Sequence, residues 1–413
     1  MRRIARSLSY LTISLTGCLS WSSYAEAQGN LPPEDRAQAS VESWAPYGTP
    51  GLVAVLAVDQ KIIWSGTAGC RSLDPCEPSR VDDLYGAGSI TKTFVSVLVH
   101  QLAGEGLIDL DQPVTEYIDP ALVKGVSNVH AAPIRTLLNH TSGIPSWEED
   151  PGWRRAGRGD EVLIGRIWQK AETLDWIRHQ EALNAPGKAF RYSNTNYTLL
   201  GLVIEAVTGR DFASVLRDEI SDPLQLGSII LEGFETVPSR RVPSRYHMLS
   251  RSFVEDVGVH DAFTDVSDGL IDVSLSNLSH EWAAGGLLVT ASDLARFASA
   301  LSAGALLSPD LQAKITTFEP IGELVSVGPG LFRMDAGKGV ALIGHQGGAL
   351  GFNAVMAWIE GTDAAIVILA NLGTIHSGHG EEHHVSNLLS NEEFFGALME
   401  IARSAKKQRR PEE

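Results

Sequence analysis

The segment GSITKTF, residues 88–94, constrains the fold of this chain more than any other stretch. Ser89 and Lys92 are three positions apart, and residues at that spacing lie on one face of a helix. An amine is then held beside a hydroxyl, which is the arrangement a serine nucleophile needs when no Ser-His-Asp triad assists it. Apolar residues follow Lys92 at helical spacing, so a helix is predicted to begin near Ser89. A second S-x-x-K pair, Ser404 and Lys407, lies in a polar tail where catalysis is not expected.

Two later motifs supply further polar groups. Tyr192-Ser193-Asn194 offers a phenol and a carboxamide, and His345-Gln346-Gly347 precedes a Gly-rich stretch that is typical of a strand and turn. No G-x-S-x-G elbow surrounds any serine, which disfavours an α/β-hydrolase. Neither a G-x-G-x-x-G fingerprint nor a P-loop occurs, so no nucleotide cofactor is expected.

Composition limits the classes of partner. The 413 residues suggest two or three domains, and a hydrophobic content of 44% with nine tryptophans is enough for a sizeable core. A formal net charge of -17 argues against nucleic acid or an anionic membrane surface as the main partner. The expected partner is a small molecule or a peptide, and the oligomeric state is left open.

The N-terminus has the pattern of an export signal. Arg2, Arg3 and Arg6 precede an apolar stretch, Leu8 to Leu15, that is too short to span a bilayer. Ala25-Glu26-Ala27 is a site for ordinary signal peptidase, which would remove residues 1–27 and give a periplasmic or secreted protein. Alternatively, Leu15-Thr16-Gly17-Cys18 resembles a bacterial lipobox, and lipidation of Cys18 would anchor the chain to a membrane.

Export bears on the two remaining cysteines. Cys70 and Cys76 form an even pair, close in sequence, and in an oxidising compartment they are expected to form a disulfide. Two unrelated free thiols are the alternative.

Strand-like segments occur at both ends of the chain and helical periods fill its middle. Gly51–Val58 and Lys61–Ala68 predict a hairpin, and three apolar runs after residue 340 predict further strands. Residues 232–279 are predicted to be mainly loop with one short strand. The expected fold is α/β of the α+β type: an antiparallel sheet built from both chain ends, flanked by helices, with an inserted mostly helical domain. The sheet domain is assigned to residues 28–90 and 283–405, the helical domain to 91–282, and a polar tail to 406–413.

Several segments, in this order along the chain, resemble the serine β-lactamase-related family, which contains class C β-lactamases, DD-peptidases, D-aminopeptidases and esterases. They are GSITKTF (88–94), IRTLLNHTSGIP (134–145), PGKAFRYSNTNYTLLGLVIEAVTG (186–209), AAGGLLVTASDLARF (283–297) and GHQGGALGF (344–352). Class A enzymes and penicillin-binding proteins carry S-x-x-K, S-D-N and K-T-G. The second and third elements here are Y-x-N and H-x-G, which resemble the peptidase and esterase branches. The resemblance implies a β-lactamase/transpeptidase-like fold.

The same resemblance implies catalytic roles for Ser89, Lys92 and Tyr192. Ser89 is the expected nucleophile, although a serine at a helix start is also a common N-cap. Tyr192 is the expected proton shuttle to the leaving group, with a core tyrosine as the alternative. Lys92 is either a neutral base, with a pKa lowered by burial or by a cation, or a cation that lowers the pKa of Tyr192. The sequence leaves these two readings open.

Four further residues are expected to bind substrate. Asn194 is expected to hold Lys92 and the substrate carbonyl, although it also fits a helix cap. His345 and Gly347 are expected to form one wall of the site, where the glycine allows a close approach of substrate backbone. The N–H of Gly348 is expected to be an oxyanion donor beside that of Ser89. His345 replaces the lysine of the K-T-G branch, so substrate carboxylates are expected to gain less there.

Three other segments are expected not to take part in catalysis. His140-Thr141-Ser142-Gly143 is expected to end a helix and shape a turn, and Trp147 to Asp160 is expected to hang over the entrance as a loop. A histidine-rich tract lacks the H-E-x-x-H zinc-binding motif, so it is expected to be a mobile surface loop, and no metal site is predicted. That tract contains His376, His379, Glu381, Glu382, His383 and His384.

Together these expectations predict an exported, cofactor-independent serine hydrolase that forms an acyl-enzyme on Ser89. The expected substrates are peptides ending in D-amino acids and small esters, with β-lactams as slow substrates or inhibitors. A true class C-like β-lactamase is one alternative. The other is a catalytically silent protein that binds peptidoglycan or a peptide, but such a protein has no need of a buried amine at Lys92.

Overall fold

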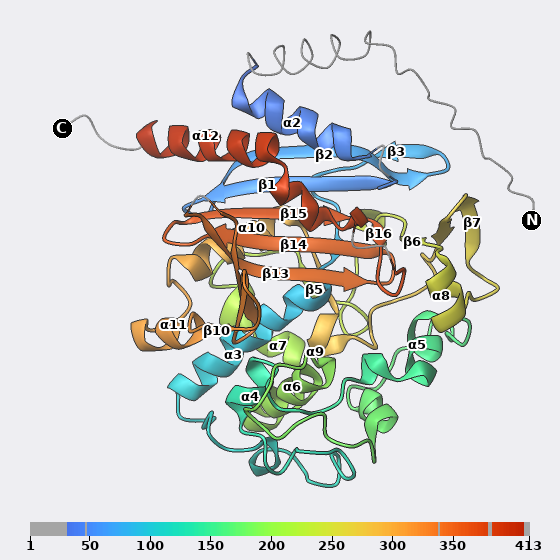
Figure 1. Cartoon of the computed structure of the whole chain (residues 1–413), viewed down its shortest axis with the longest axis vertical. Helices are drawn as coiled ribbons and strands as arrows, with labels where there is room; N and C mark the ends of the chain where they lie inside the picture. The colour runs from blue at the N-terminus through green and yellow to red at the C-terminus, as the bar shows by residue number, and fades with distance from the viewer. Residues whose placement is uncertain (1–30, 46–47, 338, 379–381, 409–413) are drawn as a thin grey trace, which may run out of the picture.

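The computed structural model describes residues 31–45, 48–337, 339–378 and 382–408 (Figure 1). The expected signal peptide and Cys18 lie outside the described residues, as do His379 and Glu381. Across the described ranges, no helix combines the length and the apolar character needed to cross a bilayer.

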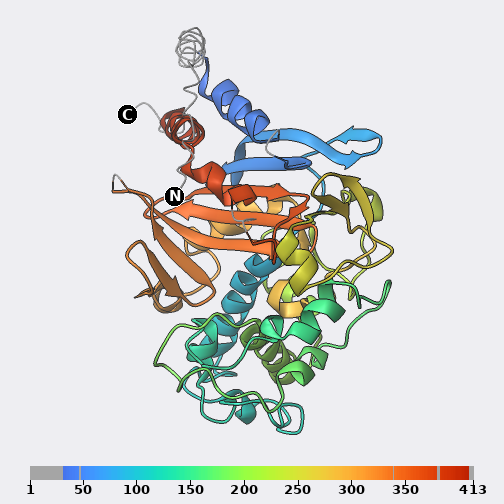
Figure 2. The same cartoon turned by 45° about the vertical axis from the view of Figure 1, so that its right-hand side comes forward.

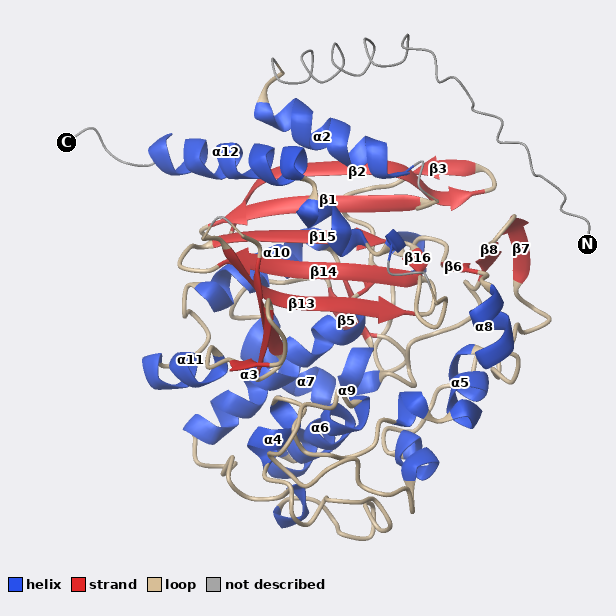
Figure 3. Ribbon diagram, in the orientation of Figure 1, coloured by secondary structure: helices blue, strands red, loops and turns tan. Residues whose placement is uncertain are grey.

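A nine-stranded antiparallel sheet forms the centre of the molecule (Figures 1 and 3). Its strand order is β10-β11-β12-β13-β14-β15-β1-β2-β3, so that the first and last parts of the chain meet where β1 pairs with β15. This is the sheet from both chain ends that the sequence predicts. The strands are β1 (Gly51–Val58), β2 (Lys61–Leu73), β3 (Cys76–Pro78), β10 (Glu319–Pro320), β11 (Val325–Gly328), β12 (Leu331–Asp335), β13 (Ala341–Ala349), β14 (Phe352–Ile359) and β15 (Ala364–Ala370).

The predicted hairpin is present as β1 and β2, and β2 extends beyond the expected end to Leu73. Its two-residue turn, Asp59 and Gln60, has positive φ at both positions, as a turn matched to strand twist requires. Every residue of β1 is buried, and alternate side chains enter different cores. The strand therefore has apolar layers on both faces.

Helices cover both faces of the sheet (Figures 1 and 2). On one face, α2 and α12 pack together and share a core with Leu52 and Ile366. On the other face, α10 contacts β1, β14 and β15, and α3 continues from there into the helical part of the chain. The helices are α2 (Pro33–Trp44), α3 (Thr91–Gly104), α4 (Ile134–Leu138), α5 (Pro151–Arg158), α6 (Asn194–Thr208), α7 (Phe212–Leu216), α8 (Arg251–Asp256), α9 (Trp282–Gly285), α10 (Ala291–Ser302), α11 (Pro309–Ile315) and α12 (Glu392–Gln408).

Two small sheets complete the fold, and the four-stranded one corrects the prediction for residues 232–279. That segment contains α8 and three short strands, whereas a loop with one strand was expected. The strands are too short and too rich in polar residues to show a period, and they form because they pair with one another and with β16. The small sheets have the orders β16-β6-β8-β7 and β4-β9-β5, from β4 (Tyr85–Gly86), β5 (Ile229–Leu231), β6 (Tyr246–Met248), β7 (Thr264–Ser267), β8 (Leu270–Asp272), β9 (Leu287–Val289) and β16 (Leu372–Gly373).

Two other expectations change in detail. The segment from Trp147 to Asp160 is not a loose loop, because it contains α5 and buries Trp147, Trp153 and Arg158. The helix α12 continues to Gln408, into the segment expected to be a polar tail. The assigned domain boundaries remain predictions.

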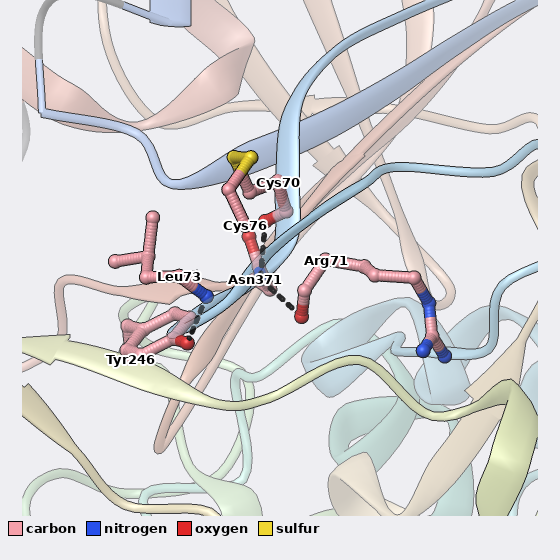
Figure 4. Close-up of a disulfide and its surroundings, with 6 residues drawn as sticks. All are labelled: Cys70, Arg71, Leu73, Cys76, Tyr246 and Asn371. Carbon is pink, nitrogen blue, oxygen red and sulfur yellow. Dashed lines mark hydrogen bonds between the residues drawn. A yellow bond between two sulfur atoms is a disulfide. The ribbon is translucent and has the colours of Figure 1, made fainter.

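Cys70 and Cys76 are disulfide-bonded across β2 and β3, with their Cα atoms 5.4 Å apart (Figure 4). Asn371, which follows β15, donates its side-chain N–H groups to the carbonyls of Cys70 and Arg71 at 3.2 and 3.4 Å. The disulfide hairpin is thereby tied to the chain that continues into β16. Whether the bond forms in solution remains a prediction.

Candidate active site

Ser89 lies in a 3₁₀ turn, Gly88–Ile90, directly before α3. Gly88 has φ +52°, and a Cβ there would lie 2.7 Å from the backbone nitrogen of Gly348. Only glycine allows this left-handed conformation at such a close approach without strain. The nucleophile turn and the Gly-rich end of β13 are therefore in close contact, and Gly88, the residue before Ser89, lies against Gly348. The oxyanion role of the Gly348 N–H remains a prediction.

Gly347 packs closely against the backbone beside the nucleophile turn, and its expected contact with substrate remains a prediction. A Cβ on Gly347 would overlap the carbonyl oxygen of Ala87, which directly precedes the nucleophile turn. The glycine is therefore required for packing of β13 against that turn, before any substrate is present.

The Oγ atom of Ser89 has two side-chain partners. Lys92 Nζ lies 2.9 Å from it, one helical turn along the chain, and Tyr192 OH lies 2.7 Å from it. Tyr192 stands just before α6, far from Ser89 in sequence. The structure therefore brings together the three residues to which catalytic roles were assigned.

Lys92 is completely buried, and its Nζ also donates to the carbonyl of Ala284 at 2.6 Å. Burial lowers the pKa of Lys92 to about 7, against the opposing effect of Glu281 and Glu148. Burial also raises the pKa of Tyr192 well above its usual value. Near neutral pH, Lys92 can thus lose its proton while Tyr192 keeps its own, which favours the reading of Lys92 as the base.

His140 supports the phenol. Its ring stacks on that of Tyr192, with centroids 4.2 Å apart and an interplanar angle of 26°. Its Nδ1 accepts the backbone N–H of Ser193 at 3.1 Å, so the proton of the neutral ring is on Nε2. Burial lowers the pKa of His140 well below its usual value. The turn expected to be structural therefore also fixes the position of Tyr192.

Asn194 contacts a different residue from the one expected. Its Nδ2 donates to Glu148 Oε2, while its Oδ1 is buried without a hydrogen-bond partner. The described hydrogen bonds of Lys92 Nζ go to Ser89 and Ala284. Ser193, which precedes α6, occupies the cap position, so Asn194 is the first helical residue.

A buried charge cluster stands behind Asn194, and sequence reasoning did not find it. Arg158 pairs with Glu148 through Nη1 and with Glu281 through Nη2, and its side chain is 1% exposed. His376 Nε2 lies 2.8 Å from the same Nη1. Because Arg158 can only donate, His376 accepts through Nε2, and burial lowers its pKa to about 3. Glu148 and Arg158 come from one segment, and Glu281 and His376 come from two distant segments. These three segments share no common motif, so no sequence signal joins them.

His345 is buried and neutral. Its Nδ1 contacts the carbonyl oxygen of Gln346 and therefore carries the ring proton, while Nε2 is buried without a partner. Burial, followed by the charge of Lys92, lowers the pKa of His345 to about 3. Its ring is edge-on to that of Phe332, with centroids 5.0 Å apart.

A cavity of about 670 Å³ opens onto Ser89 and Tyr192. Four apolar side chains on its wall come mainly from β11 and β12: Val325, Phe332, Met334 and Ile375. Its polar wall contains Glu148, His345, Gln346, Thr374, His376, Ser377, His384, Ser386 and Asn387. The volume is that of a small-molecule site.

The histidine-rich tract does not form the expected mobile surface loop throughout. The His376 side chain is 12% exposed and lies beside Arg158, and His384 Nε2 lies 3.2 Å from the carbonyl oxygen of Gly347. Both residues line the cavity. Their Gly and Ser neighbours show no helix or strand period, so the sequence did not predict that these histidines line the cavity. In the described part of the chain, no group of three His, Cys, Asp or Glu side chains is placed to hold a metal ion.

The chain is similar to known proteins in both sequence and structure. A family model described as Beta-lactamase matches residues 37–387. The D-stereospecific amidohydrolase from Streptomyces sp. has a structure 31% identical in sequence, with a TM-score of 0.74 over 88% of this chain and 99% of the other. The D-amino acid amidase from Ochrobactrum anthropi SV3, complexed with D-phenylalanine, is 25% identical, with a TM-score of 0.76 over 90% of this chain and 99% of the other.

Among curated proteins, the esterase EstB of Burkholderia gladioli is 30% identical over 203 residues, which are 48% of this chain and 50% of the esterase. The penicillin-binding protein 4* of Bacillus subtilis (strain 168) is 24% identical over 75% of this chain and 65% of its own length. The alignments thus span about half to two thirds of these curated relatives. The predicted mixed α/β fold of the β-lactamase/transpeptidase type is confirmed.

Proposed function

The chain belongs to the Beta-lactamase family, whose relatives include esterases and D-amino acid amidases, and from this premise we propose that it is an exported serine hydrolase that cleaves ester and amide bonds through an acyl-enzyme on Ser89. One observation carries the proposal: Ser89 Oγ lies within hydrogen-bond distance of both Lys92 Nζ and Tyr192 OH. A nucleophile needs a base to take its proton and an acid to protonate the leaving group, and both are present here.

The proposed acylation begins with neutral Lys92. Ser89 Oγ attacks the substrate carbonyl carbon and transfers its proton to Lys92 Nζ. The tetrahedral oxyanion accepts the N–H groups of Ser89 and Gly348, whose residues the tight contact at Gly88 brings together. Tyr192 protonates the leaving alcohol or amine as its bond to carbon breaks, and the proton on Lys92 replaces the one that Tyr192 gave.

Deacylation reverses these roles. Water attacks the acyl carbon, Tyr192 and Lys92 take its proton, and Ser89 Oγ leaves with a proton as the acid is released. No cofactor enters either half of the reaction.

The cavity wall supports a substrate with an apolar group and a neutral scissile carbonyl. Phe332, Met334 and Ile375 offer apolar surface, and His345 provides no positive charge at neutral pH. D-Amino acid amides and esters with apolar side chains fit this wall, and the two solved relatives named a D-stereospecific amidohydrolase and a D-amino acid amidase support this class of substrate. β-Lactams, which carry a carboxylate, are expected to be slow substrates or inhibitors.

The test compares D- and L-phenylalanine amides, p-nitrophenyl esters and a cephalosporin as substrates of purified protein and of Ser89→Ala. The proposal expects ester and D-amide hydrolysis that Ser89→Ala lacks. Equal activity of the two proteins would contradict it. Export is tested separately by N-terminal sequencing of the mature protein, and a lipidated Cys18 would establish the alternative processing.

A further inference from the structure

The peptide that joins Gly347 to Gly348 has a different neighbour at each of its two polar groups. Its N–H, on Gly348, is the proposed second oxyanion donor, and a Cβ on Gly88 in the nucleophile turn would lie 2.7 Å from this nitrogen. Its carbonyl oxygen, on Gly347, lies 3.2 Å from Nε2 of His384. The atoms of a peptide are held in one plane, so a hydrogen bond to the oxygen also fixes the direction of the N–H.

His384 is the donor in this hydrogen bond. Its Nδ1 accepts the backbone N–H of Ser386 at 3.2 Å and lies 2.9 Å from the Ser386 hydroxyl oxygen. A ring nitrogen that accepts an N–H carries no proton of its own, so the proton of the neutral imidazole is on Nε2. The carbonyl oxygen of Gly347 can only accept, which agrees with this tautomer.

The sheet itself holds His384 in place. His384 stands directly before a 3₁₀ helix, η9 (Val385–Ser390), and its side chain caps that helix. Val385, the first residue of η9, donates its N–H to Oδ1 of Asn353 at 3.0 Å. Asn353 is fully buried in β14, where it is the register partner of Gly348. The strand pair that carries the oxyanion donor therefore also anchors the helix start that carries the histidine.

We propose that His384 is a positioning residue for the oxyanion hole: by donating to the Gly347 carbonyl, it orients the Gly347–Gly348 peptide and strengthens the Gly348 N–H as a donor to the substrate oxyanion. The proposal rests on the proposed function and adds to it a residue that no motif indicated. Hydrogen bonds in a chain polarise one another, so a donor on the carbonyl makes the N–H of the same peptide a stronger donor. Two successive glycines make the plane of this peptide easy to rotate, and the histidine restricts that rotation.

Two substitutions separate the donor to Gly347 from the cap of η9. A glutamine amide nitrogen occupies nearly the place of histidine Nε2, whereas the shorter asparagine side chain ends near the place of Nδ1. His384→Gln therefore keeps a donor for Gly347. His384→Asn keeps an acceptor for the cap and loses the donor. His383→Asn is the matched control, because His383 is the neighbouring histidine and is not among the described residues that line the cavity.

Stopped-flow kinetics with a p-nitrophenyl ester measures the effect on rate. One oxyanion donor is worth about 100- to 1,000-fold, and a polarising hydrogen bond changes the strength of its neighbour by about 10–30%, so His384→Asn is expected to slow the reaction about twofold to eightfold. Acylation and release of the acid are expected to slow by a similar factor, because both pass through an oxyanion. The dissociation constant of the substrate is expected to change less. His384→Gln is expected to recover most of the loss, and His383→Asn to match the unmodified protein.

The infrared spectrum of the acyl-enzyme is a readout that a purely structural role of His384 would not change. The probe is p-nitrophenyl pivalate with an isotopically labelled carbonyl, whose bulky acyl group slows its release from Ser89. A weaker oxyanion donor polarises the acyl carbonyl less, so the stretching frequency of that carbonyl is expected to rise in His384→Asn and to return in His384→Gln. Urea unfolding measures the stability of each variant alongside.

The outcomes separate this proposal from the proposed function. Unchanged rates and an unchanged carbonyl frequency in His384→Asn would overturn the role of His384. An equal loss in His384→Gln and His384→Asn, or a loss of stability without a frequency shift, would also overturn it and would assign His384 to the cap of η9 alone. Each of these results leaves the acyl-enzyme on Ser89 in place. Hydrolysis that persists in Ser89→Ala, with no labelled adduct on Ser89, would remove the proposed function and the role of His384 together.

Discussion

Lys92 Nζ donates to the carbonyl oxygen of Ala284 at 2.6 Å, inside the core and next to Ser89. This bond fixes the amine in a dry position, where its charged form is disfavoured by burial. The amine is thus both oriented toward the nucleophile and poised to lose its proton near neutral pH.

The first prediction concerns pH. The proposed active form of Lys92 is neutral, and burial lowers its pKa to about 7, so kcat/KM for a neutral ester is expected to rise tenfold per unit below pH about 7 and then level off. Lys92→Arg places a group that stays protonated at every working pH, and it is expected to lose at least 100-fold in acylation. Stopped-flow measurement of acylation checks both. A flat profile between about pH 5 and about pH 8 would exclude Lys92 as the base.

Tyr192→Phe is expected to slow acylation at least 100-fold, because it removes the hydroxyl 2.7 Å from Ser89 that is the proposed proton donor to the leaving group. Its ring should still stack on His140, so the fold and substrate binding should change little. Single-turnover rates and competitive inhibition constants separate the two effects. Turnover close to that of the unmodified protein would rule out Tyr192 as the proton donor.

Gly347→Ala is expected to lower stability by about 1–3 kcal/mol and to reduce activity, because the new methyl group overlaps the Ala87 carbonyl. Gly396→Ala in α12 is the control, since its methyl group meets no atom within 4 Å and should add up to about 1 kcal/mol of helix stability. Urea unfolding measures both. Equal stability of the two variants would show that close packing of β13 against the nucleophile turn does not require glycine at position 347.

β-Lactam turnover is expected to be weak relative to ester or D-amide hydrolysis. The neutral His345 offers no cation to the lactam carboxylate, and Glu148 lies in the same cavity. Penicillin is expected to remain on Ser89 as a long-lived adduct, and His345→Lys to speed its attachment without speeding release. Steady-state kinetics and intact mass distinguish these steps. Cephalosporin hydrolysis faster than that of every ester and D-amide tested would place the protein among true β-lactamases.

The sequence predicted the strands and helices that depend on contacts between neighbouring residues, because local patterns of apolar residues indicate them. The apolar run Gly51–Val58, the helical period after Lys92 and the Gly-rich end at Gly347 appear as a strand, a helix and a strand end where expected. The meeting of Ser89 with Tyr192 followed from a resemblance in the order of motifs, since no local pattern brings two such distant residues together.

The missed features depend on contacts between distant segments. Glu148, Arg158 and Glu281 are ordinary surface residues by composition, and only the folded chain buries them together. The partner of Asn194 was wrongly assigned for the same reason, because Glu148 reaches it from a segment expected to be a loop. His376 enters the cavity wall through a Gly- and Ser-rich turn that carries no period.

The most direct measurement is identification of the residue that becomes acylated. Purified protein is mixed with a fluorophosphonate or with a slowly released p-nitrophenyl ester, digested, and mapped by tandem mass spectrometry. We expect a single adduct on Ser89, absent from Ser89→Ala and formed at least 100-fold more slowly in Lys92→Arg. A stoichiometric adduct on another residue, or full hydrolytic activity in Ser89→Ala, would contradict the proposed acyl-enzyme.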